Sequence, residues 1–245
     1  MKINENLGLV LRNIYVYDIE ACHYNLLVKF GYDVSNLNKD NKIERNTQIG
    51  KMMRESSDLS KKLRDTTNLI IDTYINENQI VENDIILRQY DGLILTKPLH
   101  TINGALLPLD LRKLFQIFIS SINRKMYIAF TNTEKTTVKG VPNRYEKMNQ
   151  YYTKLCKIAL LSSKPGIFKS LQEIKNEILE SKDPYLFAIP TEKNNKYVVF
   201  LKEYGEVEVS SSTLGIIETD DIDKIRYFQK YILPFTKTLT FEFVR

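Results

Sequence analysis

Short apolar runs that suit β-strands alternate along this chain with longer segments whose apolar residues recur every three or four positions. Two of the short runs are alike, because each consists of β-formers and carries an acidic residue. The first covers residues 7–20 and contains Asp18, and the second covers Ile85–Leu95 and contains Asp91. Helical periodicity predicts three helices between these strands: Cys22–Phe30, which Gly31 ends, Arg45–Ser57 and Leu59–Asn76.

The apolar pattern after the second acidic strand predicts a mixture of helices and strands. The stretch Leu106–Ile122 is strongly apolar and predicts a helix or a helix pair. A strand at Arg124–Phe130 and a return at Val138–Tyr145 predict a hairpin. The remaining segments predict helices at Lys147–Leu161 and Gly166–Ser181, strands at Tyr185–Ile189 and Tyr197–Tyr204, and a last helix from Ile222 to about Leu239.

The composition is that of an ordinary globular protein. Of the 245 residues 43% are hydrophobic, so the chain can bury a substantial core. A net charge of +5 favours a polyanionic partner without demanding one. Cys22 and Cys156 are too few for a disulfide framework or a zinc site, which is typical of a reducing cytoplasm. No stretch approaches the ~20 apolar residues of a membrane span, so we expect a cytoplasmic protein without a membrane partner.

Asp18 and Asp91 are candidate metal ligands. Burying a carboxylate in an apolar strand is costly unless an opposite charge compensates it, and one divalent cation can compensate two carboxylates. Phosphoryl transfer by two Mg²⁺ or Mn²⁺ ions uses carboxylates from neighbouring strands, with the ions ~3.5–4 Å apart. We therefore expect Asp18 and Asp91 to be catalytic and metal-binding, with the carbonyl of Ile19 as a further ligand. The structural alternative is that either acid caps a helix or pairs with a Lys or Arg.

The order of these elements resembles the palm of template-directed polymerases, in which an acidic strand, a basic helix, a long helix and a second acidic strand follow one another. Later segments are similar to family B DNA polymerases of phage type. Arg124–Tyr127 resembles the basic-basic-x-Tyr strand of that family, and Lys139-Gly140 with Arg144 resembles its Lys-Gly element and later Arg. Tyr227–Pro234 is similar to the aromatic helix and Ile-Leu-Pro turn of its thumb.

The resemblance implies an α+β fold with a polymerase-like palm, in which helices flank a central antiparallel sheet, and a mainly helical thumb-like C-terminal domain. Residues 1–145 would form the palm, with a short fingers-like helical insertion at about 34–80. Residues 146–245 would form the thumb. The enzyme would be minimal or one half of a split polymerase, and a viral member would work in the host cytoplasm.

The resemblance also implies a nucleotidyltransferase that performs template-directed synthesis of nucleic acid, most simply a DNA polymerase that uses Mg²⁺ or Mn²⁺. Its partners would be a primer–template duplex, nucleoside triphosphates and, in a split enzyme, a second polymerase subunit. The implied nucleotide-binding residues are His23, Tyr24, Arg45, Lys51 and Arg54. The implied nucleic-acid-binding residues are Arg124, Lys125, Tyr127, Lys139 and Arg144. For the basic residues the alternative is an ordinary solvated surface.

The chain departs from the family at both acidic motifs. The first motif of the family is Asp-x-x-Ser-Leu-Tyr-Pro, whereas Ala21-Cys22-His23-Tyr24 follows here, so either His23 or Tyr24 would close the sugar pocket. The second motif carries Asp-Thr-Asp, and Gln89 takes the place of its first acid if Asp91 is the second. If Asp91 is the first, the site resembles the single-acid arrangement of family A and single-subunit polymerases. These departures leave open a non-catalytic, polymerase-like subunit that binds nucleic acid.

Two other enzyme classes begin their metal sites with the Asp-x-Glu pattern of Asp18-Ile19-Glu20. A 3′–5′ exonuclease of the DEDD type needs a third motif, Tyr-x3-Asp or His-x4-Asp, and Tyr204 and the acids of residues 220–223 are badly placed for it. An archaeo-eukaryotic primase needs Ser-x-His, which the sequence lacks. Both classes stand as alternative hypotheses.

Overall fold

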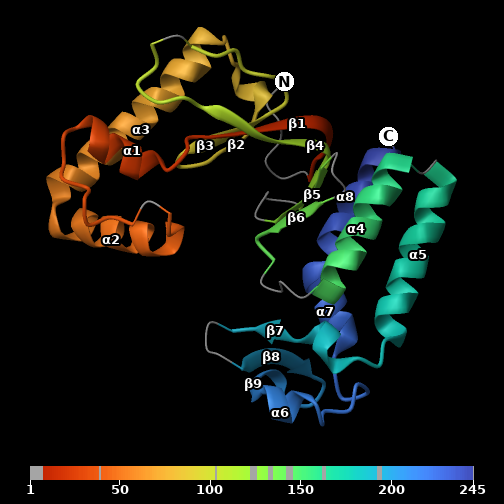
Figure 1. Cartoon of the computed structure of the whole chain (residues 1–245). Helices are drawn as coiled ribbons and strands as arrows, with labels where there is room; N and C mark the ends of the chain where they lie inside the picture. The colour runs from red at the N-terminus through yellow and green to blue at the C-terminus, as the bar shows by residue number, and fades with distance from the viewer. Residues whose placement is uncertain are drawn as a thin grey trace. The chain divides into compact units, whose positions relative to one another are not determined.

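The computed structural model describes residues 8–38, 40–102, 104–121, 126–131, 135–141, 146–161, 164–191 and 195–244. The fold is α+β, as predicted, and Figure 1 shows the order of its elements. The described residues form eight α-helices and two sheets. The six-stranded sheet has the order β2-β3-β1-β4-β5-β6, and the three-stranded sheet has the order β7-β8-β9. The strand pairs whose register is defined are antiparallel.

The chain divides into two compact units. The first unit is the continuous segment Asn13–Leu114, and the second combines Phe115–Arg245 with the start of the chain through Arg12. Strands β1 (Val10–Asp18) and β4 (Asp110–Ser120) each contain residues of both units. The division into a palm and a thumb near residue 145 stays a prediction.

Three helices follow β1 in the first unit, close to their predicted bounds: α1 (Cys22–Lys29), α2 (Lys42–Glu55) and α3 (Ser57–Glu77). Gly31, with φ of 75°, follows α1 in the left-handed region. The side chains of Asn41 and Ser56 accept backbone N–H groups at the starts of α2 and α3. The core of the unit collects apolar side chains from all these elements, including Tyr17, Leu26, Ile49, Leu63, Ile71 and Leu93.

The second acidic run is a hairpin, so the prediction of a single strand at Ile85–Leu95 is wrong. Strands β2 (Ile85–Arg88) and β3 (Gly92–Leu95) pair antiparallel, and residues 89–91 connect them. The backbone N–H of Gln89 donates to the carbonyl of Gly92 at 2.9 Å across this turn. A short polar interruption followed by glycine reverses the chain here, and Gly92 directly after Asp91 is the residue in the sequence that allows a tight bend.

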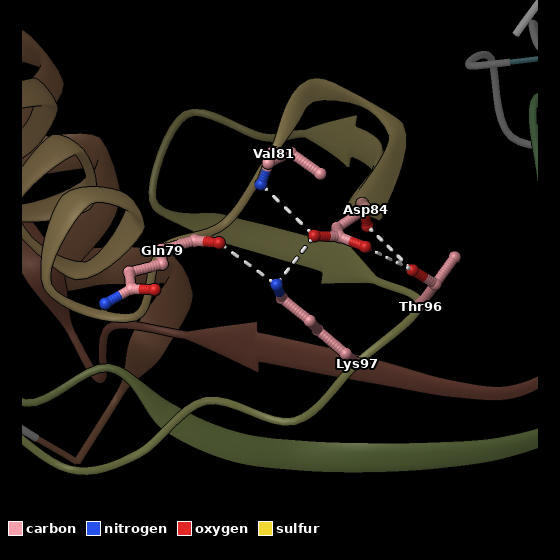
Figure 2. Close-up of polar contacts among 5 residues, drawn as sticks. All are labelled: Gln79, Val81, Asp84, Thr96 and Lys97. Carbon is pink, nitrogen blue, oxygen red and sulfur yellow. Dashed lines mark hydrogen bonds and ion pairs between the residues drawn. The ribbon is translucent and has the colours of Figure 1, made fainter. Parts of the chain in front are cut away.

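A polar cluster around Asp84 holds the open end of the hairpin (Figure 2). The Asp84 carboxylate accepts the backbone N–H of Val81 at 3.1 Å and pairs with the Lys97 ammonium at 2.8 Å. Lys97 also donates to the carbonyl of Gln79 at 3.0 Å, and the Thr96 hydroxyl donates to Asp84 at 3.4 Å. Asp84 ends the short 3-10 helix η1 (Glu82–Asp84) before β2, and Lys97 follows β3. The cluster therefore joins the two ends of the hairpin.

Strand β4 occupies the stretch for which the sequence predicts a helix, so the helix prediction for Leu106–Ile122 is wrong. Residues Ile117–Ser120 are all buried, and β4 pairs with β5 (Tyr127–Thr131). A strand covered on both faces carries a continuous apolar run, which periodicity alone does not distinguish from a buried helix. The aromatic and β-branched residues Phe115, Ile117, Phe118 and Ile119 favour the strand.

The first part of the second unit agrees with the prediction. Strands β5 and β6 (Thr136–Lys139) form a hairpin, as expected, although the predicted return at Val138–Tyr145 overlaps β6 only at Val138 and Lys139, and its residues 142–145 lie outside the described residues. The helices α4 (Glu146–Leu161) and α5 (Lys164–Glu180) are the two expected helices. Their buried faces belong to an apolar core that includes Ile128, Tyr152, Leu155, Ile167, Phe187, Phe200, Tyr227 and Phe235.

The end of the chain differs from the prediction in three places. Pro184–Phe187 is a 3-10 turn, η3, before the short β7 (Ile189–Pro190), where a longer strand is expected. Strand β8 (Lys196–Leu201) is followed by β9 (Gly205–Ser210) and α6 (Ser211–Leu214), which the sequence pattern does not predict. The expected last helix is two helices, α7 (Lys224–Tyr231) and α8 (Leu233–Val244), because Pro234 lacks an N–H and favours the first turn of a new helix.

None of the helices among the described residues has the length and apolar character needed to cross a lipid bilayer.

Candidate metal centre

Asp18 and Asp91 come from different elements of the first unit and lie at the same end of the sheet. Asp18 is the last residue of β1, and Asp91 is the last residue of the turn before β3. In the register of β1 with β3, Asp18 lies opposite Gly92. The backbone N–H of Ile19 donates to the carbonyl of Asp91 at 2.9 Å. The backbone therefore holds the two acidic residues as neighbours.

Gly92 permits this close approach. A Cβ atom built on Gly92 would lie 2.3 Å from the carbonyl oxygen of Tyr17, which is shorter than any ordinary contact. The strand carrying Asp18 can pass this close to the hairpin only where residue 92 has no side chain. Asp91 is therefore held beside β1 because the residue that follows it, Gly92, has no side chain to keep the two strands apart.

The charges around Asp18 change its ionisation. Burial is the largest cause of a rise in the pKa of Asp18 above its usual value of 3.8, and the charge of Asp91 raises the pKa further. Arg112 and Lys42 oppose this rise through their positive charges. Asp18 therefore ionises less readily than a carboxyl group in water, and a cation bound by both carboxylates would favour its ionised form.

A pocket of about 890 Å³ lies over this pair, and its wall is formed by β1, α1, α2, β4 and the hairpin turn. Both signs of charge line it. Its acidic residues are Asp18, Glu20, Asp40 and Asp91, and its basic residues are Lys42, Arg45 and Arg112. A pocket that holds both carboxylates and cations suits a ligand that carries a metal ion together with phosphates.

Three of the five predicted nucleotide-binding residues line the pocket. They are His23, Tyr24 and Arg45, and the guanidinium carbon of Arg45 lies 5.8 Å from the centre of the Tyr24 ring. The other two, Lys51 and Arg54, are exposed on α2 and are not among the lining residues. Arg54 instead borders a separate depression of about 520 Å³ between α2 and α3.

Lys42 and Arg112 line the pocket although sequence reasoning did not select them. Lys42 is the first residue of α2 and precedes Arg45, where that helix is predicted to begin. Arg112 lies on β4, where a helix was predicted, and its guanidinium lies 3.4 Å from the Glu20 carboxylate. The signal that could have found Arg112 is a basic residue in a strand that neighbours β1, which requires the correct strand assignment.

The predicted nucleic-acid-binding residues are described only in part. Arg124, Lys125 and Arg144 lie outside the described residues. The Tyr127 ring is buried in the second unit, with its centre 4.9 Å from that of Phe118. Lys139 lies opposite Tyr127 in the pairing of β5 with β6 and is exposed to solvent.

Asp18 and Asp91 carry the type of oxygen ligand that magnesium and manganese ions prefer. Mg²⁺ commonly binds one or two carboxylates and completes its shell with water and substrate phosphates. Asp18 and Asp91 provide two such carboxylates, and the Ile19 carbonyl belongs to the same segment as Asp18. Within the described ranges no three or more His, Cys, Asp or Glu side chains are grouped as a metal site. A cation here would therefore rely on the two aspartates together with substrate and water.

The protein therefore has an α+β fold, and Asp18 at the end of β1 and Asp91 in the neighbouring turn line one pocket. The chain belongs to the family of the bacteriophage PBS1 gene 130 protein, because the model of that family matches residues 3–211. The family takes its name from a bacteriophage protein, which is consistent with a phage origin. No curated protein matches the chain.

Proposed function

We propose that this protein is a divalent-cation-dependent nucleotidyltransferase that extends a nucleic acid strand on a template, most simply as a DNA polymerase. The observation that carries the proposal is the pairing of Asp18 and Asp91 in a pocket that also contains basic side chains. The raised pKa of Asp18 supports it, because two close carboxylates are typical of a site that a cation completes.

Each element of the pocket has a role in this proposal. Asp18 and Asp91, with the Ile19 carbonyl, would hold Mg²⁺ or Mn²⁺. The ions would activate the attacking hydroxyl oxygen and stabilise charge on the leaving phosphate. Lys42, Arg45 and Arg112 line the same pocket and would bind the phosphates of a nucleoside triphosphate. Tyr24 would pack against the sugar or the base, beside the Arg45 guanidinium.

The nucleic acid would be a primer–template duplex bound through its phosphates. The net charge of +5 favours such a partner, and exposed Lys139 is one candidate contact. A phosphate contact of this kind weakens with salt and does not depend on base sequence. A second polymerase subunit would complete the enzyme if this chain binds a duplex too weakly alone.

A primer-extension assay tests the proposal. Wild-type protein with Mg²⁺ or Mn²⁺ and nucleoside triphosphates should lengthen a labelled primer on a template. Asp18→Asn and Asp91→Asn should each lower the rate by at least about 100-fold, as loss of a charge-stabilising group does in other active sites. Asp220→Asn, at an exposed residue of the second unit, is the matched control and should keep full activity.

The assay also separates the alternatives. A primer that shortens in the absence of nucleotides would indicate a 3′–5′ exonuclease. A wild-type protein that binds the duplex without extending it, with or without Mn²⁺, would contradict the stand-alone enzyme. Gln89, which begins the hairpin turn and is not acidic, is the feature that favours this non-catalytic form.

A further inference from the structure

His23 of α1 and Tyr90 of the hairpin turn form a side-chain pair beside Asp91. The His23 Nε2 atom and the Tyr90 hydroxyl oxygen are 2.9 Å apart, and the two rings meet edge to face with centres 5.1 Å apart. Tyr90 directly precedes Asp91, so this contact ties the tip of the hairpin to α1. His23 also lines the pocket that lies over Asp18 and Asp91.

The turn that carries Asp91 is anchored from three directions. The Ile19 N–H of the segment after β1 donates to the Asp91 carbonyl at 2.9 Å. Within the hairpin, the Gln89 N–H donates to the Gly92 carbonyl at 2.9 Å. These two bonds fix the backbone, and the bond from Tyr90 to α1 adds a side-chain anchor on the residue next to the carboxylate.

The surroundings of His23 favour its neutral form. Burial is the main cause that lowers the pKa of His23 below its usual value of 6.5, and Arg64 lowers it too, while the charge of Asp91 acts in the opposite direction. A neutral imidazole has one N–H donor and one acceptor nitrogen, so it can bond to a tyrosine hydroxyl in either tautomer. It does so without adding a positive charge that would compete with a bound cation.

Helix α1 is itself fixed to α3 at the residue next to His23. The Cys22 Sγ atom lies 3.3 Å from the Thr67 hydroxyl oxygen, and Thr67 donates its proton to the Leu63 carbonyl at 2.8 Å. Because Thr67 has a single hydroxyl proton, the Cys22 thiol is the donor in their contact. Burial raises the pKa of Cys22 to about 11, which keeps this donor protonated. The helix that carries His23, the partner of Tyr90, is therefore held against α3.

We propose that His23 and Tyr90 are positioning residues, which hold the Asp91 carboxylate where it can share a divalent cation with Asp18. This inference rests on the proposed metal-dependent function. Partners that orient metal ligands from outside the coordination shell commonly change metal affinity by about 10–100-fold when they are removed.

Titration with Mn²⁺, followed by electron paramagnetic resonance or calorimetry, tests this role on the full chain. His23→Ala and Tyr90→Phe remove the same hydrogen bond from opposite sides, and each should weaken Mn²⁺ binding by about 10-fold. The double variant should lose less affinity than the sum of the two single losses, because both changes delete the shared hydrogen bond between His23 and Tyr90. His23→Gln keeps an amide that can bond to the Tyr90 hydroxyl, and it should recover most of the affinity.

His100→Ala is the matched control, because His100 is the second of the two histidines and is exposed. It should bind Mn²⁺ like the wild type. Wild-type affinity in His23→Ala, or fully additive losses in the double variant, would overturn the positioning role.

Amide hydrogen exchange without metal gives a second measurement. The Ile19 N–H, which is bonded to the Asp91 carbonyl, should exchange about 10-fold faster in His23→Ala and Tyr90→Phe if the pair holds the turn. Unchanged exchange of that amide, in a wild type that binds Mn²⁺, overturns the positioning role alone. A wild type that does not bind Mn²⁺ overturns the metal site itself, whatever the exchange result.

Discussion

The two ends of the β2–β3 hairpin carry acidic side chains in opposite situations. At the open end, Asp84 is paired with Lys97 and accepts further hydrogen bonds. The hydrogen bond from Lys97 is the largest cause that lowers the pKa of Asp84 below its usual value of 3.8. At the tip, Asp91 lies beside Asp18, and the pKa of Asp18 is raised. The charge of Asp84 is therefore paired within the hairpin. At the tip the charge of Asp91 opposes the ionisation of Asp18, and Arg112 and Lys42 offset this effect in part.

The approach of the tip to β1 should be the most sensitive feature of this hairpin. We expect Gly92→Ala to destabilise the protein by about 2 kcal/mol, because the added methyl would lie 2.3 Å from the Tyr17 carbonyl oxygen and must push the strands apart. The melting temperature should fall by roughly 4–8 °C, measured by circular dichroism. Gly50→Ala is the control, since nothing lies within 4 Å of its added methyl and alanine favours the helix. Equal melting temperatures for the two variants would contradict the close approach.

A substitution at the open end of the hairpin should destabilise the protein less than Gly92→Ala does. We expect Asp84→Ala to cost about 1 kcal/mol at neutral pH, as the loss of a side-chain acceptor for a backbone N–H does. Since the pKa of Asp84 is lowered on folding, its contribution is present above pH 3.8 and disappears as the pH falls through the lower value in the folded state. Urea unfolding of both proteins across acidic pH measures this. A difference in stability that stays constant down to pH 2 would show that the charge of Asp84 contributes nothing.

Asp18 should show the smallest effect, with the opposite sign. Its pKa is raised on folding, so the stability of the metal-free protein falls as the pH rises from 3.8 through the folded value. We expect Asp18→Asn to be the more stable protein at pH 7, by less than about 1 kcal/mol because the group is partly solvated. Thermal unfolding with and without Mn²⁺ checks this, because a bound ion should stabilise only the wild type. A variant less stable than the wild type without metal would refute the repulsion between Asp18 and Asp91.

The sequence predicted the features that depend on neighbouring residues. The helices α1 to α5 follow from the periodicity of their apolar residues, and the two acids stand out because charge is unusual in an apolar strand. The features that depend on strand register were missed. Arg112 reaches the pocket only because β4 is a strand, and Tyr90 meets His23 only because residues 89–91 turn. Both depend on long-range pairing that a local pattern of apolar residues does not encode.

The way the chain forms its two units has a consequence for the order in which they are made. The segment Asn13–Leu114 is continuous, whereas the second unit is built from both sides of it. The Leu9 carbonyl accepts the N–H of Ser120 at 2.9 Å, so Leu9 can meet this partner only after Asn13–Leu114 has been translated. Domains generally fold as they leave the ribosome, N-terminal part first. A nascent chain can therefore form the pocket over Asp18 and Asp91 before the segment that precedes Asn13 has its hydrogen-bond partner in β4.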